Sequence, residues 1–311
     1  MTGHPTSRPP SRPCAAVIWS CSRPRPSTGS PPTRDPHAVA RIYAVKGRPA
    51  DHPLILHIAD AADLDSWTTD VPDYARRLAT AAWPGPLTLV LRRSPAVGDF
   101  VTGGQDTVAV RVPDHDLARE ILREFGSAVA APSANRFGRV SPTTADHVRA
   151  DLDLAAGDVV VDGGPAAVGV ESTIVDCTGP RPILLRPGRY SAADIERLSG
   201  VPVAPLPEVA PRVSGSLASH YSPTARVVVV AEPIATPGTG LIALESVPTP
   251  PGVVRLMAPS DIEDYARRLY WALREADALA LELVAAIPPG GDSGLAHAVA
   301  DRLARAAADT D

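Results

Sequence analysis

Apolar residues follow two different periods between residues 35 and 200. A helical period predicts helices at 36–46, 71–82, 114–125, 143–151 and 191–199. Short runs rich in Val, Ile, Leu and Thr predict strands at 54–58, 87–91, 107–111, 129–131, 159–162, 173–176 and 183–186. Because helices and strands alternate, this region is predicted to form one α/β domain.

A second, smaller α/β domain is predicted after a linker. Residues 201–223 form the linker, because this segment is rich in Pro, Val and Ser. The second domain spans 224–311, with strands expected at 226–230 and 241–244 and helices at about 260–276 and 294–308.

The first 34 residues differ from the rest of the chain. They are saturated with Pro, Ser, Arg and Thr and show no apolar period. Proline lacks the N–H that a strand ladder needs, and the tract has little apolar surface to bury. Residues 1–34 are therefore predicted to be disordered, to supply no strand and to leave a neighbouring strand edge unpaired.

Composition excludes several function classes. The net charge of −5 and the pI of about 5.9 argue against bulk binding to nucleic acid or to a membrane surface. Cys14, Cys21 and Cys177 show no metal-ligand spacing, which fits a reduced cytoplasmic compartment. No apolar run is long enough to span a bilayer, and no signal peptide is expected.

Two cations mark the corner between the first predicted helix and the strand that follows it. Asp35 and Pro36 begin this helix, and Gly47 ends it between Lys46 and Arg48. A pinned backbone makes the two side chains converge, which suits a polyphosphate. Taken alone, the pair also fits an ordinary charged surface.

Other polar residues lie at strand ends or inside strands. Thr107 and Arg111 are four residues apart on one strand and face the same side, and a cation between valines needs a partner or a ligand. Ser133, Asn135 and Ser141 flank a glycine turn and suggest an anion and nucleotide cradle. For Ser133 and Asn135 taken alone, capping of the next helix is the favoured interpretation.

Further candidates are less specific by themselves. Ser172 also fits an ordinary strand residue, and Arg186 also fits a surface charge. His52 and His57 are five residues apart, which is poor metal-ligand spacing. No Cys/His pair and no Ser/His/Asp arrangement suggests covalent catalysis.

Six segments occur in an order and spacing that resembles the YrdC/Sua5 family, in its long two-domain form: KGRPADHPL, WPGPLTLVL, TVAVRVP, APSANRFGRVSPT, VESTIVD and LLRPGRY. The resemblance covers about residues 35–309 and includes the linker end SHYSP. It implies a YrdC-like twisted α/β domain, then a linker and a small Rossmann-like C-terminal domain. It also implies a nucleotidyltransferase, an L-threonylcarbamoyladenylate synthase that uses ATP, L-threonine and bicarbonate and releases pyrophosphate.

The resemblance assigns roles to residues. Lys46 and Arg48 are implied to be catalytic. The implied ATP-binding residues are Lys46, Arg48, His52, Thr107, Ser133, Asn135, Ser141, Arg186 and Tyr221. The implied threonine-binding residues are His57, Arg111, Ala131 and Ser172. Many relatives carry Asn in place of His52, and Tyr221 is implied to act as a lid.

The resemblance also implies partners. Mg²⁺ is expected to be held by the phosphates of ATP, with no protein metal site. The product is expected to pass to the machinery that threonylcarbamoylates tRNA adenosine next to the anticodon, in the cytoplasm and without a membrane. Weak binding to tRNA or double-stranded RNA is also implied.

The N-terminal segment departs from the family pattern. Family members begin with a strand and a loop that resembles GG-x-VxFPTETVYGLGADA, which supplies much of the threonine pocket. Residues 15–33 read AAVIWSCSRPRPSTGSPPT instead. When permitted codons for this segment are read from each third base, they spell GGHLVVFPTETVYGLAADA, directly before residue 34. We therefore hypothesise that residues up to about 34 are a frame-shifted reading of the family's N-terminus, which impairs activity.

Two other functions stay open from the sequence. Related domains in hydrogenase-maturation proteins use carbamoyl phosphate, but this chain has no CxxC pair of the kind that accompanies them. A YrdC-type domain could also serve as a non-catalytic protein that binds tRNA or double-stranded RNA, for which the net charge of −5 is unfavourable.

Overall fold

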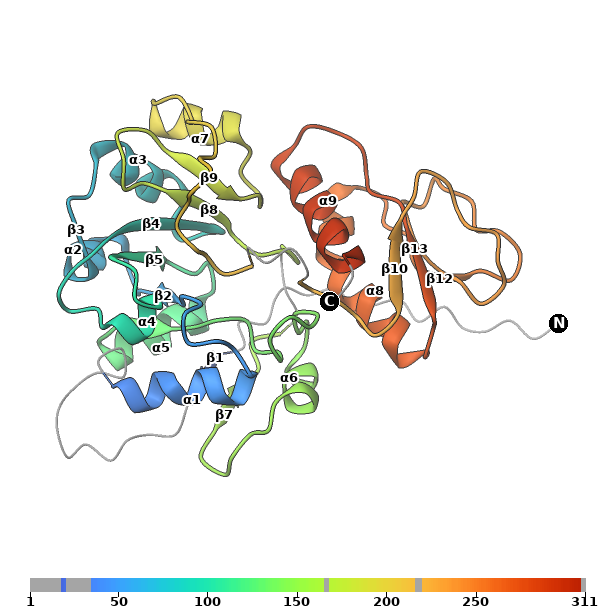
Figure 1. Cartoon of the computed structure of the whole chain (residues 1–311), viewed down its shortest axis with the longest axis horizontal. Helices are drawn as coiled ribbons and strands as arrows, with labels where there is room; N and C mark the ends of the chain where they lie inside the picture. Colours follow the sequence, from blue (N-terminus) through green and yellow to red (C-terminus); the bar gives the residue numbers. More distant parts are fainter. Residues whose placement is uncertain (1–17, 21–34, 165–167, 216–219, 309–311) are drawn as a thin grey trace.

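The computed structural model of the chain describes residues 18–20, 35–164, 168–215 and 220–308, and two α/β units lie side by side in it (Figure 1). The expected disorder of residues 1–34 concerns a segment of which the structure describes only residues 18–20. The predicted helices and strands between residues 35 and 200 are confirmed, with ends shifted by at most two residues.

Seven strands form the main sheet. They are β2 (Ile55–His57), β3 (Thr68–Thr69), β4 (Leu87–Arg93), β5 (Thr107–Arg111), β6 (Val129–Ala130), β8 (Thr173–Asp176) and β9 (Ile183–Arg186). The order is β6-β2-β5-β4-β8-β9, and β3 pairs with β4. The pairs β2–β5 and β4–β8 are parallel and the others are antiparallel, so this is a mixed sheet.

One face of the main sheet packs against helices. Leu56, Leu89 and Val110 point into a core that Leu78 and Ile195 complete from the helix side. The helices of this unit are α1 (Pro36–Lys46), α2 (Leu64–Trp67), α3 (Asp73–Ala82), α4 (Asp99–Thr102), α5 (Asp116–Phe125), α6 (Ala145–Asp151) and α7 (Ala192–Ser199), with a 3₁₀ turn at Ala61–Asp63. Burial of these alternate strand positions fixes which side chains remain for the opposite face.

The opposite face of the main sheet is covered by the linker. Ile55, Val90, Ala109 and Ile174 form a small apolar cluster there, and Val213 of the linker packs on it. The polar strand positions between these apolar residues therefore lie under the linker.

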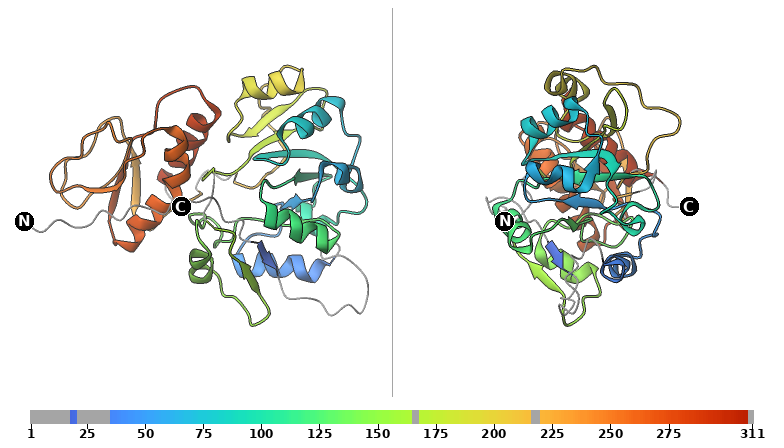
Figure 2. Two further views of the ribbon diagram at one scale, coloured as in Figure 1. Left: turned by 180° about the vertical axis from the view of Figure 1, so that it is seen from behind. Right: turned by 90° about the vertical axis from the view of Figure 1, so that its left-hand side faces the viewer.

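The second unit has a four-stranded parallel sheet. Its strands are β10 (Arg226–Val229), β11 (Gly240–Ile242), β12 (Val254–Met257) and β13 (Leu283–Ala286), in the order β10-β13-β11-β12. The helices α8 (Ile262–Ala278) and α9 (Gly294–Ala307) lie between this sheet and the first unit (Figures 1 and 2). The sequence predicted both helices and the first two strands. It missed β12, which Arg255 interrupts, and β13, half of which is alanine, a residue that favours helices.

The N-terminal tract contains one short strand. Contrary to the expectation of no strand, β1 (Ile18–Ser20) pairs antiparallel with β7 (Val159–Val161) in a separate two-stranded sheet. These three residues lie in a stretch without proline and include a β-branched and an aromatic residue, which favours a strand. The strand does not join the main sheet.

Candidate functional site

The linker-covered face of the main sheet carries the polar residues that the sequence singled out. On β5, Thr107 and Arg111 alternate with Ala109 of the apolar cluster, so the prediction that they face one side is confirmed. The same alternation places His57 beside Ile55, and Ser172 beside Ile174.

Lys46 is the last residue of α1, and both the helix end and hydrogen bonds of its ammonium group fix its position. Asp35 caps the start of the helix by accepting from the His37 N–H at 2.9 Å, and Gly47 ends it in the left-handed region at φ 62°. The Lys46 ammonium donates to the carbonyl oxygens of Ser133 and Asn135. Burial, aided by the nearby charge of Arg48, lowers the pKa of Lys46 to about 7.

Arg48 turns back toward the start of β2. Its guanidinium donates to the carbonyl oxygens of His52 at 3.2 Å and Pro53 at 2.8 Å, and it lies 5.4 Å from the Phe137 ring centroid. Burial lowers the pKa of Arg48 to about 10, so it remains charged at neutral pH. The ring of His52 also packs edge-on against Phe137 at 5.2 Å, which places His52 next to this corner.

The predicted cradle at residues 133–141 divides into two parts. Ser133 is exposed, whereas Asn135 is buried and its amide donates to the carbonyl oxygens of Arg136 and Arg139, both at 2.8 Å. The Asn135 Oδ1 atom is buried and accepts no hydrogen bond from the described residues. Ser141 lies apart from them, because its hydroxyl donates to Glu171 at 2.9 Å.

Arg186 is bound to the residue that opens β8. Its guanidinium donates to the Ser172 carbonyl oxygen at 2.8 and 3.0 Å and to the Ser172 hydroxyl at 3.1 Å. The Ser172 hydroxyl also lies 2.7 Å from the Thr88 hydroxyl. Arg186 is only 3% exposed, so the interpretation of Arg186 as a surface charge is wrong.

The linker brings Arg48 and Arg186 together. The Ser214 hydroxyl accepts from Arg48 at 3.2 Å, while its carbonyl oxygen accepts from Arg186 at 2.8 Å. Next to it, a Cβ atom at Gly215 would lie 2.5 Å from the Tyr221 hydroxyl, so only glycine fits there. The linker thus closes over the two cations.

Two of the implied threonine-binding residues, His57 and Arg111, lie at one end of β2 and β5. His57 and Arg111 are register partners, and Arg111 donates to the Gly85 carbonyl oxygen at 2.9 Å. Burial and the charge of Arg111 lower the pKa of His57 to about 3, so its ring is neutral. Ala131 lies at the other end of β2, where its N–H donates to the Ile55 carbonyl oxygen at 3.0 Å.

Tyr221 is placed between the two units. It is 2% exposed, its ring stacks on Tyr270 at 5.4 Å, and Arg302 lies 5.3 Å from its centroid. The ring of His220 lies 4.2 Å from that of Tyr221 in a tilted arrangement, and 6.0 Å from the ring of Phe137. The implied lid residue is therefore part of the interface core, and its contact with ATP stays a prediction.

Sequence reasoning missed several residues of this site. Thr88 is a polar residue inside the apolar run of β4, which was a usable signal. Ser214 and Phe137 gave no signal, because their contacts depend on how the linker returns. Glu171 was visible only as the neighbour of Ser172.

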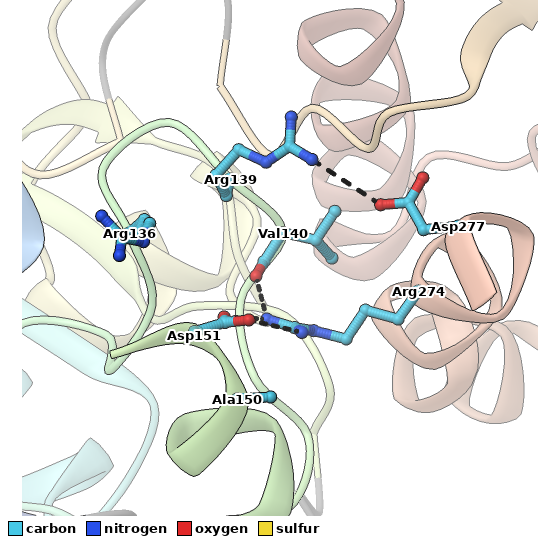
Figure 3. Close-up of a pocket in the computed structure, with 7 residues that line it drawn as sticks. All are labelled: Arg136, Arg139, Val140, Ala150, Asp151, Arg274 and Asp277. Carbon is cyan, nitrogen blue, oxygen red and sulfur yellow. Dashed lines mark hydrogen bonds and ion pairs between the residues drawn. The ribbon is translucent and has the colours of Figure 1, made fainter. Parts of the chain in front are cut away.

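A separate pocket of about 180 Å³ lies between the units, outside this site (Figure 3). Arg274 of α8 donates there to Asp151 of α6 and to the Val140 carbonyl oxygen, and Arg139 faces Asp277 at 3.9 Å. Each arginine of these pairs already has an acidic partner, so the pocket is an interface feature.

No group of three or more His, Cys, Asp or Glu in the described part of the chain could hold a metal ion. Among the described helices, none is both long and apolar enough to cross a membrane.

Two family models match the chain. The model described as "Telomere recombination", which covers Sua5, YciO and YrdC proteins, matches residues 32–188. The model described as "Threonylcarbamoyl-AMP synthase, C-terminal domain" matches residues 190–308.

Relatives and solved structures agree with these matches. A threonylcarbamoyl-AMP synthase of Pyrococcus abyssi is 38% identical over 299 residues, with 88% of this chain and 85% of that protein covered. One of Bacillus subtilis is 44% identical over 207 residues, although the match covers only 57% of that protein and 62% of this chain. The crystal structure of P. abyssi Sua5 complexed with L-threonine superposes with a TM-score of 0.78 at 36% identity, over 88% of this chain and 86% of that one. The chain therefore belongs to the YrdC/Sua5 family and carries both of its domains.

Proposed function

We propose that this protein is an L-threonylcarbamoyladenylate synthase, a nucleotidyltransferase that acts on MgATP, L-threonine and bicarbonate. The observation that carries the proposal is the convergence of Arg48 and Arg186 under the linker, with the buried ammonium of Lys46 close to the charge of Arg48. In the described residues, none of these three cations forms an ion pair with a carboxylate. Buried cations without acidic partners suit an anionic ligand.

The chemistry needs no protein nucleophile. The threonine amine attacks the carbon of bicarbonate or CO₂, and a carbamate forms with loss of water or a proton. A carbamate oxygen then attacks the α-phosphorus of ATP, and the bond to the bridging oxygen breaks to release pyrophosphate. The protein must hold the two substrates in line and stabilise the charge that grows on pyrophosphate, which Lys46, Arg48 and Arg186 can do.

The remaining residues suit the two substrates. The free Asn135 Oδ1 can accept a hydrogen bond from a hydroxyl of the ribose, with Ser133 two residues before it. Ser141, which is bound to Glu171, would contact the nucleotide from the other part of the cradle. His52, Thr107 and Tyr221 complete the proposed ATP site. Mg²⁺ enters with the phosphates of ATP as part of the substrate.

For threonine, the charge of Arg111 suits the carboxylate. Neutral His57, with Ala131 and Ser172, would form the rest of the pocket. The product would then serve the enzymes that threonylcarbamoylate tRNA in the cytoplasm.

Pyrophosphate release that depends on both L-threonine and bicarbonate tests the proposal, with the N-terminus restored as described in the Discussion. Pyrophosphate release at the same rate with and without L-threonine would contradict the proposal. A salt-dependent shift of tRNA in a gel, without any ATP turnover, would instead favour the non-catalytic RNA-binding function.

Binding of ATP is expected to take up a proton above pH 7. The pKa of Lys46 is about 7 in the free protein, and a nearby polyphosphate must raise it by favouring the ammonium form. At pH 8 the uptake should therefore approach about one proton, and affinity should fall as pH rises past 7. Titration calorimetry in two buffers of different ionisation enthalpy measures the uptake, and Lys46→Met should abolish it. Equal uptake in both proteins would exclude Lys46 as its source.

Removal of the second domain is expected to leave the first one folded but to lower synthase activity. The helix-side core of the first unit contains no described residue beyond Val203, and only the small cluster on the opposite face includes a later residue, Val213. Because Val201 and Val203 pack against that core, a chain that ends after Ala204 should unfold at a higher temperature than one that ends at residue 200. Thermal unfolding followed by circular dichroism, together with pyrophosphate release, checks both points. Full activity in either truncated chain would show that Tyr221 and the second domain are dispensable.

A further inference from the structure

Glu171 connects the two units directly beside the proposed nucleotide site. It precedes Ser172, and its carboxylate accepts three hydrogen bonds. One comes from the Ser141 hydroxyl at 2.9 Å, within the same unit. The other two come from the second unit, where the Tyr270 hydroxyl donates at 2.6 Å and Arg302 Nε donates at 2.9 Å.

Charge keeps this carboxylate ionised. Burial alone would raise the pKa of Glu171, but the charges of Arg302 and Arg186 and the hydrogen bonds from Tyr270 and Arg302 outweigh it and lower the pKa to about 2. The side chain of Arg302 is fully buried, and it also donates to the Pro187 carbonyl oxygen at 3.1 Å. Arg302 therefore contacts residues adjacent to both Ser172 and Arg186.

The same two residues also hold the end of the linker. Tyr221 lies against the stacked ring of Tyr270 and the guanidinium of Arg302, and its hydroxyl approaches Gly215, next to Ser214. A buried network in which every member has partners fixes one arrangement of its parts. Tyr270 and Arg302 thus contact both Glu171, which lies just before β8, and the end of the linker that covers Arg48 and Arg186.

We propose that Tyr270 and Arg302 are positioning residues, through which docking of the second unit sets the affinity of the first unit for ATP. This inference rests on the proposed function. Tyr270 and Arg302 do not reach the nucleotide themselves. They hold Glu171, which holds Ser141 and orients Ser172 with Arg186, and they hold the linker closed through Tyr221.

Two matched pairs of variants of the full chain test this role. Tyr270→Phe removes one hydroxyl that donates to Glu171, and Tyr265→Phe removes one from the same helix that donates to Ile287 at 3.0 Å within the second unit. Arg302→Met is paired with Arg268→Met, whose guanidinium donates to Asp264 of its own helix at 3.2 Å. Each control loses the same chemical group, and the hydrogen bond that it loses lies within the second unit.

Two readouts separate positioning from stability. Calorimetry measures the dissociation constant for MgATP, and hydrogen exchange measures protection of the amides at 170–175 and 220–222 without any nucleotide. Tyr270→Phe should weaken ATP binding by about tenfold, since a hydrogen bond to a charged group is lost. It should also speed exchange in both segments, whereas Tyr265→Phe should alter only the unfolding temperature. Arg302→Met should weaken ATP binding and speed exchange more than Tyr270→Phe does. Arg268→Met should leave both the ATP affinity and the exchange in these segments unchanged.

The outcomes distinguish this inference from the proposed function. If Tyr270→Phe leaves amide hydrogen exchange at 170–175 and 220–222 unchanged, the positioning role is overturned, whether or not the affinity for MgATP changes. Equal loss of ATP affinity in Tyr270→Phe and Tyr265→Phe would overturn it as well, because the effect would then be general destabilisation. Absence of ATP binding by the parent chain would contradict the proposed function, while the exchange comparison would still decide whether the units are coupled. If Arg302→Met does not fold, the milder Tyr270→Phe decides the result.

Discussion

Replacement of residues 15–33 by GGHLVVFPTETVYGLAADA is expected to raise threonine-dependent pyrophosphate release by at least about a hundredfold. The two segments have equal length, so the distance to Lys46 is unchanged. The resemblance to the family implies that the introduced loop supplies much of the threonine pocket. Misplacement of a substrate by about 1 Å can cost a hundredfold in rate, and loss of half a pocket should cost no less.

The described part of the N-terminal tract of this chain adds no strand to the main sheet. Its strand β1 pairs with β7 and not with the main sheet, so the sheet end that carries His57 and Arg111 gains no strand from it. The residues proposed for the phosphates lie outside the tract. The dissociation constant for MgATP should therefore change much less than the threonine-dependent rate.

The chain as written serves as the control in the same assay. Equal activity of the two proteins would show that the N-terminal loop is dispensable and that the threonine pocket is wrongly assigned. The frame-shift hypothesis has its own test in the nucleotide sequence of the gene. It is abandoned if codons 15–33 do not spell the family motif in the other frame.

Arg48→Ala in the restored protein is expected to reduce pyrophosphate release by about a hundredfold or more while the fold persists. Removal of one group that stabilises developing charge typically costs 10²–10³ in rate. Arg48 is 8% exposed and has no carboxylate partner among the described residues, so its charge is available to phosphate. Lys46→Ala should have an effect in the same range.

Arg92→Ala provides the matched control. Arg92 lies on β4 of the same sheet, but its side chain is 51% exposed and pairs with Asp106 on the surface at 3.1 Å. Its removal should leave activity unchanged. Normal turnover in both Arg48→Ala and Lys46→Ala, measured beside unchanged circular dichroism spectra, would disprove their role at the phosphates.

Local features of this fold could be predicted from the sequence because local chemistry decides them. The Asp35 cap and Gly47 set the ends of α1, and the alternation of Thr107, Ala109 and Arg111 set the face of β5. In each case the determining residues are within a few positions of the feature.

Features that depend on distant parts of the chain could not be predicted in this way. The hydrogen bond between Ser214 and Arg48 joins residues 166 positions apart in the sequence, and the one between Tyr270 and Glu171 joins residues 99 positions apart. Nothing near Arg186 in the sequence shows that Ser172 and the linker would bury it. The three-residue strand β1 was also missed, because the prolines around it dominated the local pattern.

The central claim is tested most directly by mass spectrometry of the product. The restored protein is incubated with MgATP, L-threonine and isotopically labelled bicarbonate, and the mixture is separated by liquid chromatography. We expect threonylcarbamoyl-AMP that carries the label, formed in equal amount with pyrophosphate and absent when threonine is omitted. Consumption of ATP without any labelled adduct, or no consumption of ATP at all, would contradict the central claim.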